Sequence, residues 1–231
     1  MIIYYKGTVF NSGAEALVNT VNCVGFMGGG IALEYKLRYP EMFEDYAEKC
    51  KRKQIQTGKV DYYKYPDGVT IVNFPTKYHF KYPSQLSWIR QGLADFLLTY
   101  KQQGFSSVAF PKLGCGKGNL DWNEVKPVME KMLGQVDIDV YICLDEVPAA
   151  QGVEKQMLDA FEAMTVDDIS QVIKLNAKQK SALENSRPYR RFYEIALTGS
   201  IGKTTYERLF TYFYKIKQIE SKDEEQIKWD V

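Results

Sequence analysis

Residues 15–32 constrain the fold most, because an apolar, β-branched run leads there through an asparagine-containing turn into three consecutive glycines. The run over residues 16–21 predicts a strand, and the pattern from Ile31 onward predicts a helix. Gly28, Gly29 and Gly30 allow close approach of an anion, toward which the helix would direct free N–H groups and its positive dipole end. This segment therefore indicates a phosphate and ribose site, with an ordinary tight turn as the alternative.

A second glycine loop follows another short β-like run, over residues 107–111, and precedes a helix predicted from near Trp122. The loop comprises Leu113, Gly114, Cys115, Gly116, Lys117 and Gly118. In open α/β sheets such loops gather at the carboxyl ends of the strands, where ligands bind. The two loops together are therefore predicted to hold a diphosphate from two sides.

Strand and helix patterns alternate through the first part of the chain. Strands are predicted over residues 2–6, 16–21, 59–65, 70–74, 107–110 and 139–144, and helices over 31–38, 40–53, 83–103 and 122–133. Pro40 and Pro83 suit the first turns of their helices. The alternation predicts a three-layer α/β domain, and the hairpin expected over residues 59–74 makes its sheet mixed.

After residue 144 only helical patterns remain. We therefore predict an α/β domain over residues 1–146, a linker over 147–152 and a small all-helical region over 153–231. Its helices are expected over residues 153–164, 165–175, 177–185, 189–198 and 204–219.

Composition excludes several classes of site. Thirty basic and 29 acidic residues leave a formal charge of +1, so any attraction to nucleic acid must be local. The four cysteines form no C-x-x-C pair and His79 is the only histidine, so neither a metal site nor a cofactor is expected, and Cys115 is interpreted as a small loop residue. No signal peptide or long apolar run is recognisable, which predicts a cytoplasmic protein without membrane contact.

Three motifs give the first 145 or so residues a resemblance to macrodomains, the α/β modules that bind ADP-ribose. VNTVNCVGFMGGGIA, NFPTK and PKLGCGKGNLDW occur in the order typical of one branch of that family. That branch contains the DarG-type DNA ADP-ribosyl glycohydrolase antitoxins and the terminal ADP-ribose protein glycohydrolases. The resemblance implies a mixed six-stranded sheet between helices, with ADP-ribose in a cleft above the two glycine loops.

The resemblance also implies roles for individual residues. Asn22 would hold the distal ribose, and Lys77 in NFPTK would be catalytic. Either the neutral amine of Lys77 attacks the anomeric carbon of that ribose, or its cation stabilises charge on the breaking bond. The expected ADP-ribose contacts are Thr8, Val9, Asn19, Gly28, Gly29, Gly30, Ile31, Ala32, Pro75, Thr76 and residues Leu113, Gly114, Cys115, Gly116, Lys117 and Gly118 of the second loop, with Tyr78 and His79 on the nucleotide side.

Three positions depart from the family pattern. Thr8 stands where macrodomains often carry an aspartate for the adenine amino group, and Gly29 stands where DarG-type sequences commonly carry lysine. Gly118 occupies the position of the catalytic aspartate of the protein-directed glycohydrolases, which favours the DNA-directed members. The alternatives are an ADP-ribose-1″-phosphate phosphatase, because MGGGIALEYKLRYP resembles the yeast-type enzymes, and a reader that binds ADP-ribose without catalysis.

The helical region mixes basic and aromatic residues, as in Tyr189-Arg190-Arg191. This pattern suits single-stranded DNA, and residues 197–210 weakly resemble a helix-hairpin-helix turn. The alternatives are a helical bundle with an aromatic core and a module that contacts a toxin. We predict a metal-independent glycohydrolase that removes ADP-ribose from single-stranded DNA, with thymidine as the expected base, and that acts as antitoxin to a DNA ADP-ribosyltransferase.

Overall fold

The computed structural model describes residues 1–229, including the side chains of residues 1–217. It divides into two compact units, Met1–Glu146 and a second unit from Val147 onward. No helix among the described residues combines the length and the apolar character that a membrane crossing requires.

The first unit is built on a single mixed sheet. Its strands are β1 (Ile2–Tyr5), β2 (Ala16–Asn22), β3 (Asp61–Lys64), β4 (Thr70–Lys77), β5 (Ser107–Pro111) and β6 (Asp139–Cys143). They lie in the order β1-β6-β5-β2-β4-β3, and β3 alone among them runs antiparallel to its neighbour. The predicted six-stranded mixed sheet is thereby confirmed.

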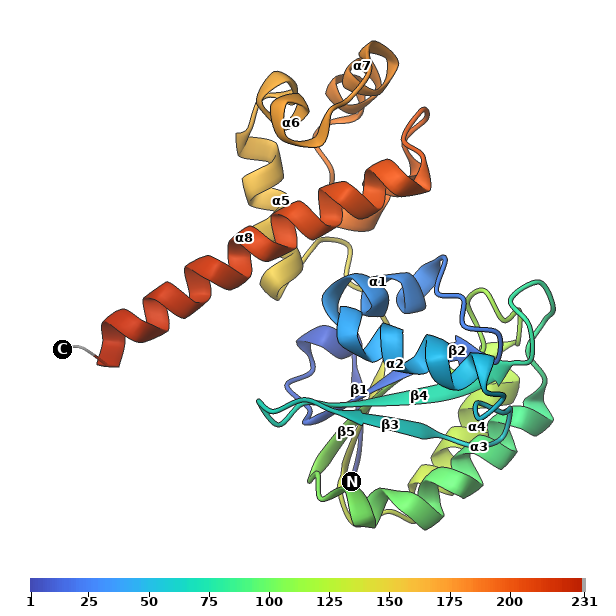
Figure 1. The fold of residues 1–231 in the computed structure, drawn as a ribbon. Helices are drawn as coiled ribbons and strands as arrows, with labels where there is room; N and C mark the ends of the chain where they lie inside the picture. The colour runs from blue at the N-terminus through green and yellow to red at the C-terminus, as the bar shows by residue number, and fades with distance from the viewer. Residues whose placement is uncertain (230–231) are drawn as a thin grey trace. The chain divides into compact units, whose positions relative to one another are not determined.

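Helices cover both faces of this sheet, which confirms the three-layer prediction. On one face lie α1 (Gly30–Arg38) and α2 (Pro40–Lys51), and on the other lie α3 (Leu86–Thr99) and α4 (Trp122–Leu133) (Figure 1). Two short 3-10 helices, η1 (Val9–Asn11) and η2 (Tyr100–Gln103), complete the unit. Alternate strand residues serve the two faces, so that Val18 and Phe74 pack in one core layer while Leu17 and Ile71 pack in the other.

Two predicted element boundaries are wrong for reasons of tertiary structure. Strand β4 continues through Pro75 to Lys77, because its neighbour β3 pairs only as far as Asn73 and needs no N–H from Pro75. Helix α3 begins at Leu86 and not at Pro83. The intervening Ser84 donates its backbone N–H to the Gly118 carbonyl at 2.9 Å, which holds this segment outside the helix.

The second unit is helical, as predicted. It contains α5 (Gly152–Ala163), α6 (Val166–Ile173), α7 (Ala177–Ser186), the 3-10 helix η3 (Phe192–Leu197) and α8 (Lys203–Trp229). Residues 189–198, predicted as a helix, form only the short η3, so the resemblance of residues 197–210 to a helix-hairpin-helix lacks its first α-helix.

The aromatic rings of the second unit form its core. Seven of them are buried, and they are Phe161, Tyr189, Phe192, Tyr206, Phe210, Phe213 and Tyr214. Arg191 is also buried, and its guanidinium pairs with the Glu154 carboxylate at 3.0 Å. These rings and this arginine are therefore unavailable for stacking on DNA. Tyr193 of the same region is 48% exposed, so contact of the tail with DNA stays a prediction.

The packing of α3 generates a first prediction. Phe96 is fully buried and its ring contacts those of Tyr100 and Phe110, with centroids 5.4 and 5.2 Å away. Phe96→Ala should lower the free energy of unfolding by about 3–5 kcal/mol, because it leaves a cavity between helix and sheet. Urea unfolding followed by tryptophan fluorescence measures this change. The exposed Leu98 of the same helix supplies the control, and a Leu98→Ala loss equal to that of Phe96→Ala would contradict the assignment.

Candidate functional site

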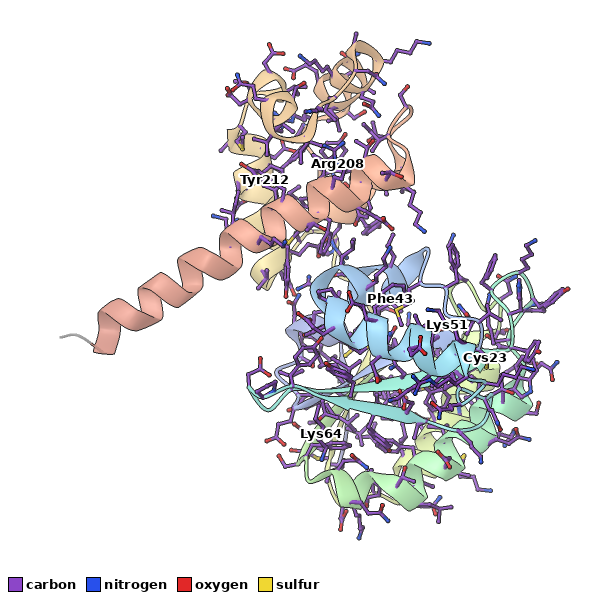
Figure 2. The ribbon with its side chains drawn as sticks, viewed as in Figure 1. Cys23, Phe43, Lys51, Lys64, Arg208 and Tyr212 are labelled. Carbon is purple, nitrogen blue, oxygen red and sulfur yellow. The ribbon has the colours of Figure 1, made fainter. Side chains whose placement is uncertain are left out.

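Strands β2 and β4 bring Asn22 and Lys77 together. They pair in parallel, and a register shift after Val21 sets Asn22 opposite Lys77, the last residue of each strand. The pairing continues past the sheet, since the Cys23 N–H donates to the Tyr78 carbonyl at 3.1 Å. Cys23 lies where the chain leaves β2 (Figure 2). Two segments thus leave the same sheet edge side by side, as expected for a ligand site in an α/β fold.

The buried side chain of Asn22 shapes the first glycine loop. Its Oδ1 accepts from the N–H groups of Val24 and Phe26 at 2.9 and 3.4 Å, and its Nδ2 donates to the Phe26 carbonyl at 2.5 Å. The Tyr46 hydroxyl donates to the Asn22 carbonyl at 2.6 Å. Asn22 therefore fixes the loop geometry, and its contact with a ribose stays a prediction.

The two glycine loops meet beside Lys77. Gly30 begins α1 with φ +59°, and a Cβ built there would lie 3.6 Å from Cγ of Lys117 in the second loop. The Lys77 ammonium donates to the Lys117 carbonyl. Gly28, Gly29, Ile31 and Ala32 are all partly accessible, so the start of α1 presents its backbone N–H groups at this edge.

Close packing fixes the glycines at both ends of the second loop. Gly114 adopts φ +71°, and a Cβ at Gly118 would overlap the Gly114 carbonyl and the Ser84 hydroxyl. Gly116, between them, is exposed and has open space around it. No side chain fits at Gly118 in this conformation, so the loop has no room for the aspartate that the protein-directed glycohydrolases carry there.

Electrostatics distinguish Lys77 from the other nucleophiles at this edge. Partial burial and then the nearby Lys117 charge lower the pKa of the Lys77 ammonium, which favours the neutral amine. Burial raises the pKa of Cys115 to about 11, and that of Cys23 to about 11. Neither thiol is therefore a thiolate near neutral pH, whereas the shift at Lys77 is toward its reactive form.

Several predicted contact residues lie below the surface of the site. Asn19, one of the expected ADP-ribose contacts, is fully buried in the middle of β2. Its Nδ2 donates to Asn73 Oδ1 at 3.1 Å and approaches the Met27 sulfur at 3.8 Å, beneath the first loop. Asn19 thus supports the loop from inside.

Other predicted contacts are also set inside the fold. Thr8 and Val9 follow β1 and are both buried, with the Val9 side chain packed in the core. Pro75, Thr76 and Leu113 are buried as well. These residues position the site, while the glycine backbones and Lys77 form its accessible part.

Three exposed aromatic residues in the segments that follow Asn22 and Lys77 were not predicted as site residues from the sequence. Phe26, Phe80 and Tyr82 are exposed, and the Phe26 and Phe80 rings lie 4.5 Å apart. The only local signal was the aromatic content of YHFKY at residues 78–82, which contains the predicted Tyr78 and His79. Within the described part of the chain, no group of three or more His, Cys, Asp or Glu residues could hold a metal ion.

Comparison with known families and proteins agrees with this geometry. The model of the Macro domain family matches residues 18–129. A DNA ADP-ribosyl glycohydrolase of Mycobacterium tuberculosis is 45% identical over 146 residues, which cover 62% of this chain and 42% of that protein. The solved macrodomain of M. tuberculosis DarG is 45% identical with a TM-score of 0.60, and the match covers 62% of this chain and 97% of that structure.

A second relative comes from Thermosipho africanus. Its DNA ADP-ribosyl transferase-DNA ADP-ribosyl glycohydrolase fusion protein is 34% identical over 176 residues, 67% of this chain and 45% of that protein. A solved structure of T. africanus DarTG in complex with ADP-ribose matches at 33% identity with a TM-score of 0.58, over 63% of this chain and 42% of that one. The chain spans less than half the length of these two curated relatives.

The packing of the second loop yields a prediction on stability. Gly118→Ala should lower the free energy of unfolding by about 1–3 kcal/mol, because the new methyl group meets backbone and the Ser84 side chain. Gly116→Ala is the matched control, since nothing lies within 4 Å of the added atom. Urea unfolding of both variants measures the difference, and equal stabilities would show that the loop is looser than described.

Proposed function

Because the chain belongs to the macrodomain family, we propose that its first unit is a glycohydrolase that removes ADP-ribose from ADP-ribosylated DNA bases. The observation that carries this proposal is the position of Lys77, at the end of β4 and bonded to the Lys117 carbonyl of the second glycine loop. The activity named for the M. tuberculosis relative supports it. The lack of space for a side chain at Gly118 supports the DNA-directed branch.

ADP-ribose would bind across the two loops. The N–H groups at the start of α1 and those of residues 114–118 suit the diphosphate, and the Lys117 ammonium adds positive charge. The loop held by Asn22 would receive the distal ribose, whose anomeric carbon then lies toward Lys77. The chain provides this cradle mainly from backbone groups, so no metal is required in the proposal.

In the proposed reaction the neutral amine of Lys77 attacks the anomeric carbon. The bond from that carbon to the base nitrogen breaks, and its electron pair leaves with the base. The base nitrogen takes up one proton, which balances the proton that the attacking amine loses when its nitrogen bonds to the carbon. Water then replaces the lysine on the carbon, which releases ADP-ribose and returns the amine. The lowered pKa of Lys77 makes the attacking form accessible at lower pH than in an ordinary lysine.

We infer that the protein counteracts a DNA ADP-ribosyltransferase toxin. The T. africanus relative joins a transferase and a glycohydrolase in one polypeptide, which supports a functional pairing of the two activities. In the second unit most of the described aromatic side chains are buried, whereas Tyr193 and Arg208 are exposed (Figure 2 labels Arg208). This unit therefore suits contact with a protein, such as the toxin, better than stacking on bases.

The first functional prediction concerns Lys77. Wild-type protein should release ADP-ribose from an ADP-ribosylated thymidine oligonucleotide, and Lys77→Ala should lower kcat by at least about 100-fold while it still binds ADP-ribose. Chromatography of released ADP-ribose and calorimetric titration measure the two quantities. Lys64→Ala is the control, because Lys64 ends β3 and bonds the Gln103 carbonyl away from the loops (Figure 2).

Failure of this experiment has a clear meaning. Tight binding of ADP-ribose without any release by the wild type would reject the glycohydrolase and leave a reader. Release of phosphate from ADP-ribose-1″-phosphate would identify the phosphatase instead. Full activity in Lys77→Ala would reject the lysine as catalyst while retaining the hydrolase.

A second prediction concerns pH. If the neutral amine attacks, kcat/KM should rise with pH and level off above the pKa of Lys77, which lies below 10.5. Lys117→Gln should move this rise to higher pH, because it removes a positive charge that lowers the Lys77 pKa but keeps the backbone carbonyl. Initial rates across neutral and alkaline pH test both curves. A rate that falls with pH would show that the cation is the active form.

A further inference from the structure

Exposed apolar side chains concentrate beside Lys77. Five large ones lie in two short segments, and they are Val24 (41% exposed), Phe26 (44%), Tyr78 (63%), Phe80 (40%) and Tyr82 (62%). The segments leave β2 and β4 directly after Asn22 and Lys77. Contiguous exposed apolar surface of this kind usually marks an interaction site.

Three of these side chains, Phe26, Phe80 and Tyr82, form one continuous surface with the partly exposed His79 ring. We call this surface the aromatic platform. The Phe26 and Phe80 centroids are 4.5 Å apart, and the His79 ring stacks on Phe80 at 4.3 Å. Tyr82 lies 5.6 Å from His79. The platform therefore joins the first glycine loop to the segment after Lys77.

Backbone contacts hold the platform in place. The Asn22 side chain binds both the N–H and the carbonyl of Phe26. The Tyr82 N–H donates to the His79 carbonyl at 3.1 Å, and the Lys81 N–H donates to His79 Nδ1 at 3.2 Å. The rings are thus preorganised for a partner, so little ordering of the chain is needed on binding.

The charge around the platform is positive. Residues 22–30, 77–85 and 112–120 contain four lysines, namely Lys77, Lys81, Lys112 and Lys117, and no Asp or Glu. One of them, Lys112, is paired with the Glu146 carboxylate at 3.0 Å, so the other three carry the positive charge of these segments. The Lys81 ammonium lies 6.0 Å from the centre of the Phe80 ring. Exposed rings bordered by lysines match the bases and phosphates of a single strand, whereas a protein interface typically has fewer lysines.

We propose that the aromatic platform stacks unpaired bases that flank the ADP-ribosylated base in single-stranded DNA. The proposal rests on the proposed glycohydrolase function and adds how the strand is held. Stacking tolerates any base, because every base offers a flat π-face, and Lys81 is placed to meet a neighbouring phosphate. The platform would recognise the strand, while the glycine loops bind ADP-ribose.

The test compares two substrates that share the same reacting bond. One is an ADP-ribosylated thymidine within an oligonucleotide, and the other is ADP-ribosylated thymidine alone. Phe80→Ala and Tyr82→Ala should each raise KM for the oligonucleotide by about tenfold at unchanged kcat, and should leave the nucleoside KM and the affinity for ADP-ribose unchanged.

Two variants control for loss of structure. Tyr82→Phe keeps the ring and should behave as wild type. Tyr4→Ala removes a comparably exposed tyrosine, 40% accessible, from β1 of the same unit and should leave both substrates unaffected. An equal KM for the oligonucleotide in Phe80→Ala, Tyr82→Ala and wild type would overturn the platform, as would an equal effect on both substrates.

Binding of an unmodified fluorescent oligonucleotide separates failure of the platform from failure of the glycohydrolase. If the wild-type protein releases no ADP-ribose, the glycohydrolase function is rejected. Fluorescence anisotropy still measures the affinity of the protein for the oligonucleotide in that case. About tenfold weaker binding by Tyr82→Ala would then support the platform as a strand-binding surface. Equal affinity of Tyr82→Ala and wild type for the oligonucleotide would overturn the platform as a strand-binding surface. The same result is expected if the platform contacts a protein instead of DNA.

Discussion

The parallel pairing of β2 with β4 is the constraint on which the site depends. It sets Asn22 opposite Lys77 at a register shift and carries both segments off the same sheet edge. One segment continues into the first glycine loop and α1, and the other into the aromatic platform. A shift of one residue in the pairing of β2 with β4 would place paired side chains on opposite faces of the sheet. It would also separate the Asn22 amide from the Lys77 amine. The pairing of β2 with β4 therefore determines the starting point of the first glycine loop, the position of Lys77 and the position of the aromatic platform.

Buried polar groups help to fix that register. Asn19 faces Asn73 across the β2–β4 pair, Asn73 donates to Asp61 of β3 at 3.4 Å, and Asp61 accepts from Lys49 of α2 at 2.7 Å. Burying such groups unpaired is costly, so an alternative register that broke these bonds would be disfavoured. Since Met27 lies against Asn19, the same network supports the first glycine loop from below.

Sequence patterns within single segments predicted most helices and strands. Some element boundaries and the contacts of the site depend on residues far apart in the sequence. Helix α4 has its predicted bounds, because Asp121 caps it through the Asn123 N–H at 2.9 Å and its apolar spacing is regular. The start of α3 was mispredicted, since it depends on a bond from Ser84 to Gly118. Lys77 stood out only through its family motif: its partner Lys117 lies 40 residues away, and no local pattern indicates that contact.

The sequence of the second unit was also compatible with two functions for its aromatic residues, because contacts between distant segments decide which of them are buried. Aromatic residues spaced along helices suit a bundle core or a stacking surface equally, and only burial separates the two; here Phe192 and Phe213 are internal. Under the proposed function, recognition of bases would fall to the first unit, where the platform segment follows Lys77 directly along the chain. The net charge of the chain is +1, and three lysines of the platform and loop segments, Lys77, Lys81 and Lys117, are not paired with a carboxylate there, so strand binding should involve only a few phosphates. Its affinity would consequently depend only weakly on salt, because few counterions are released.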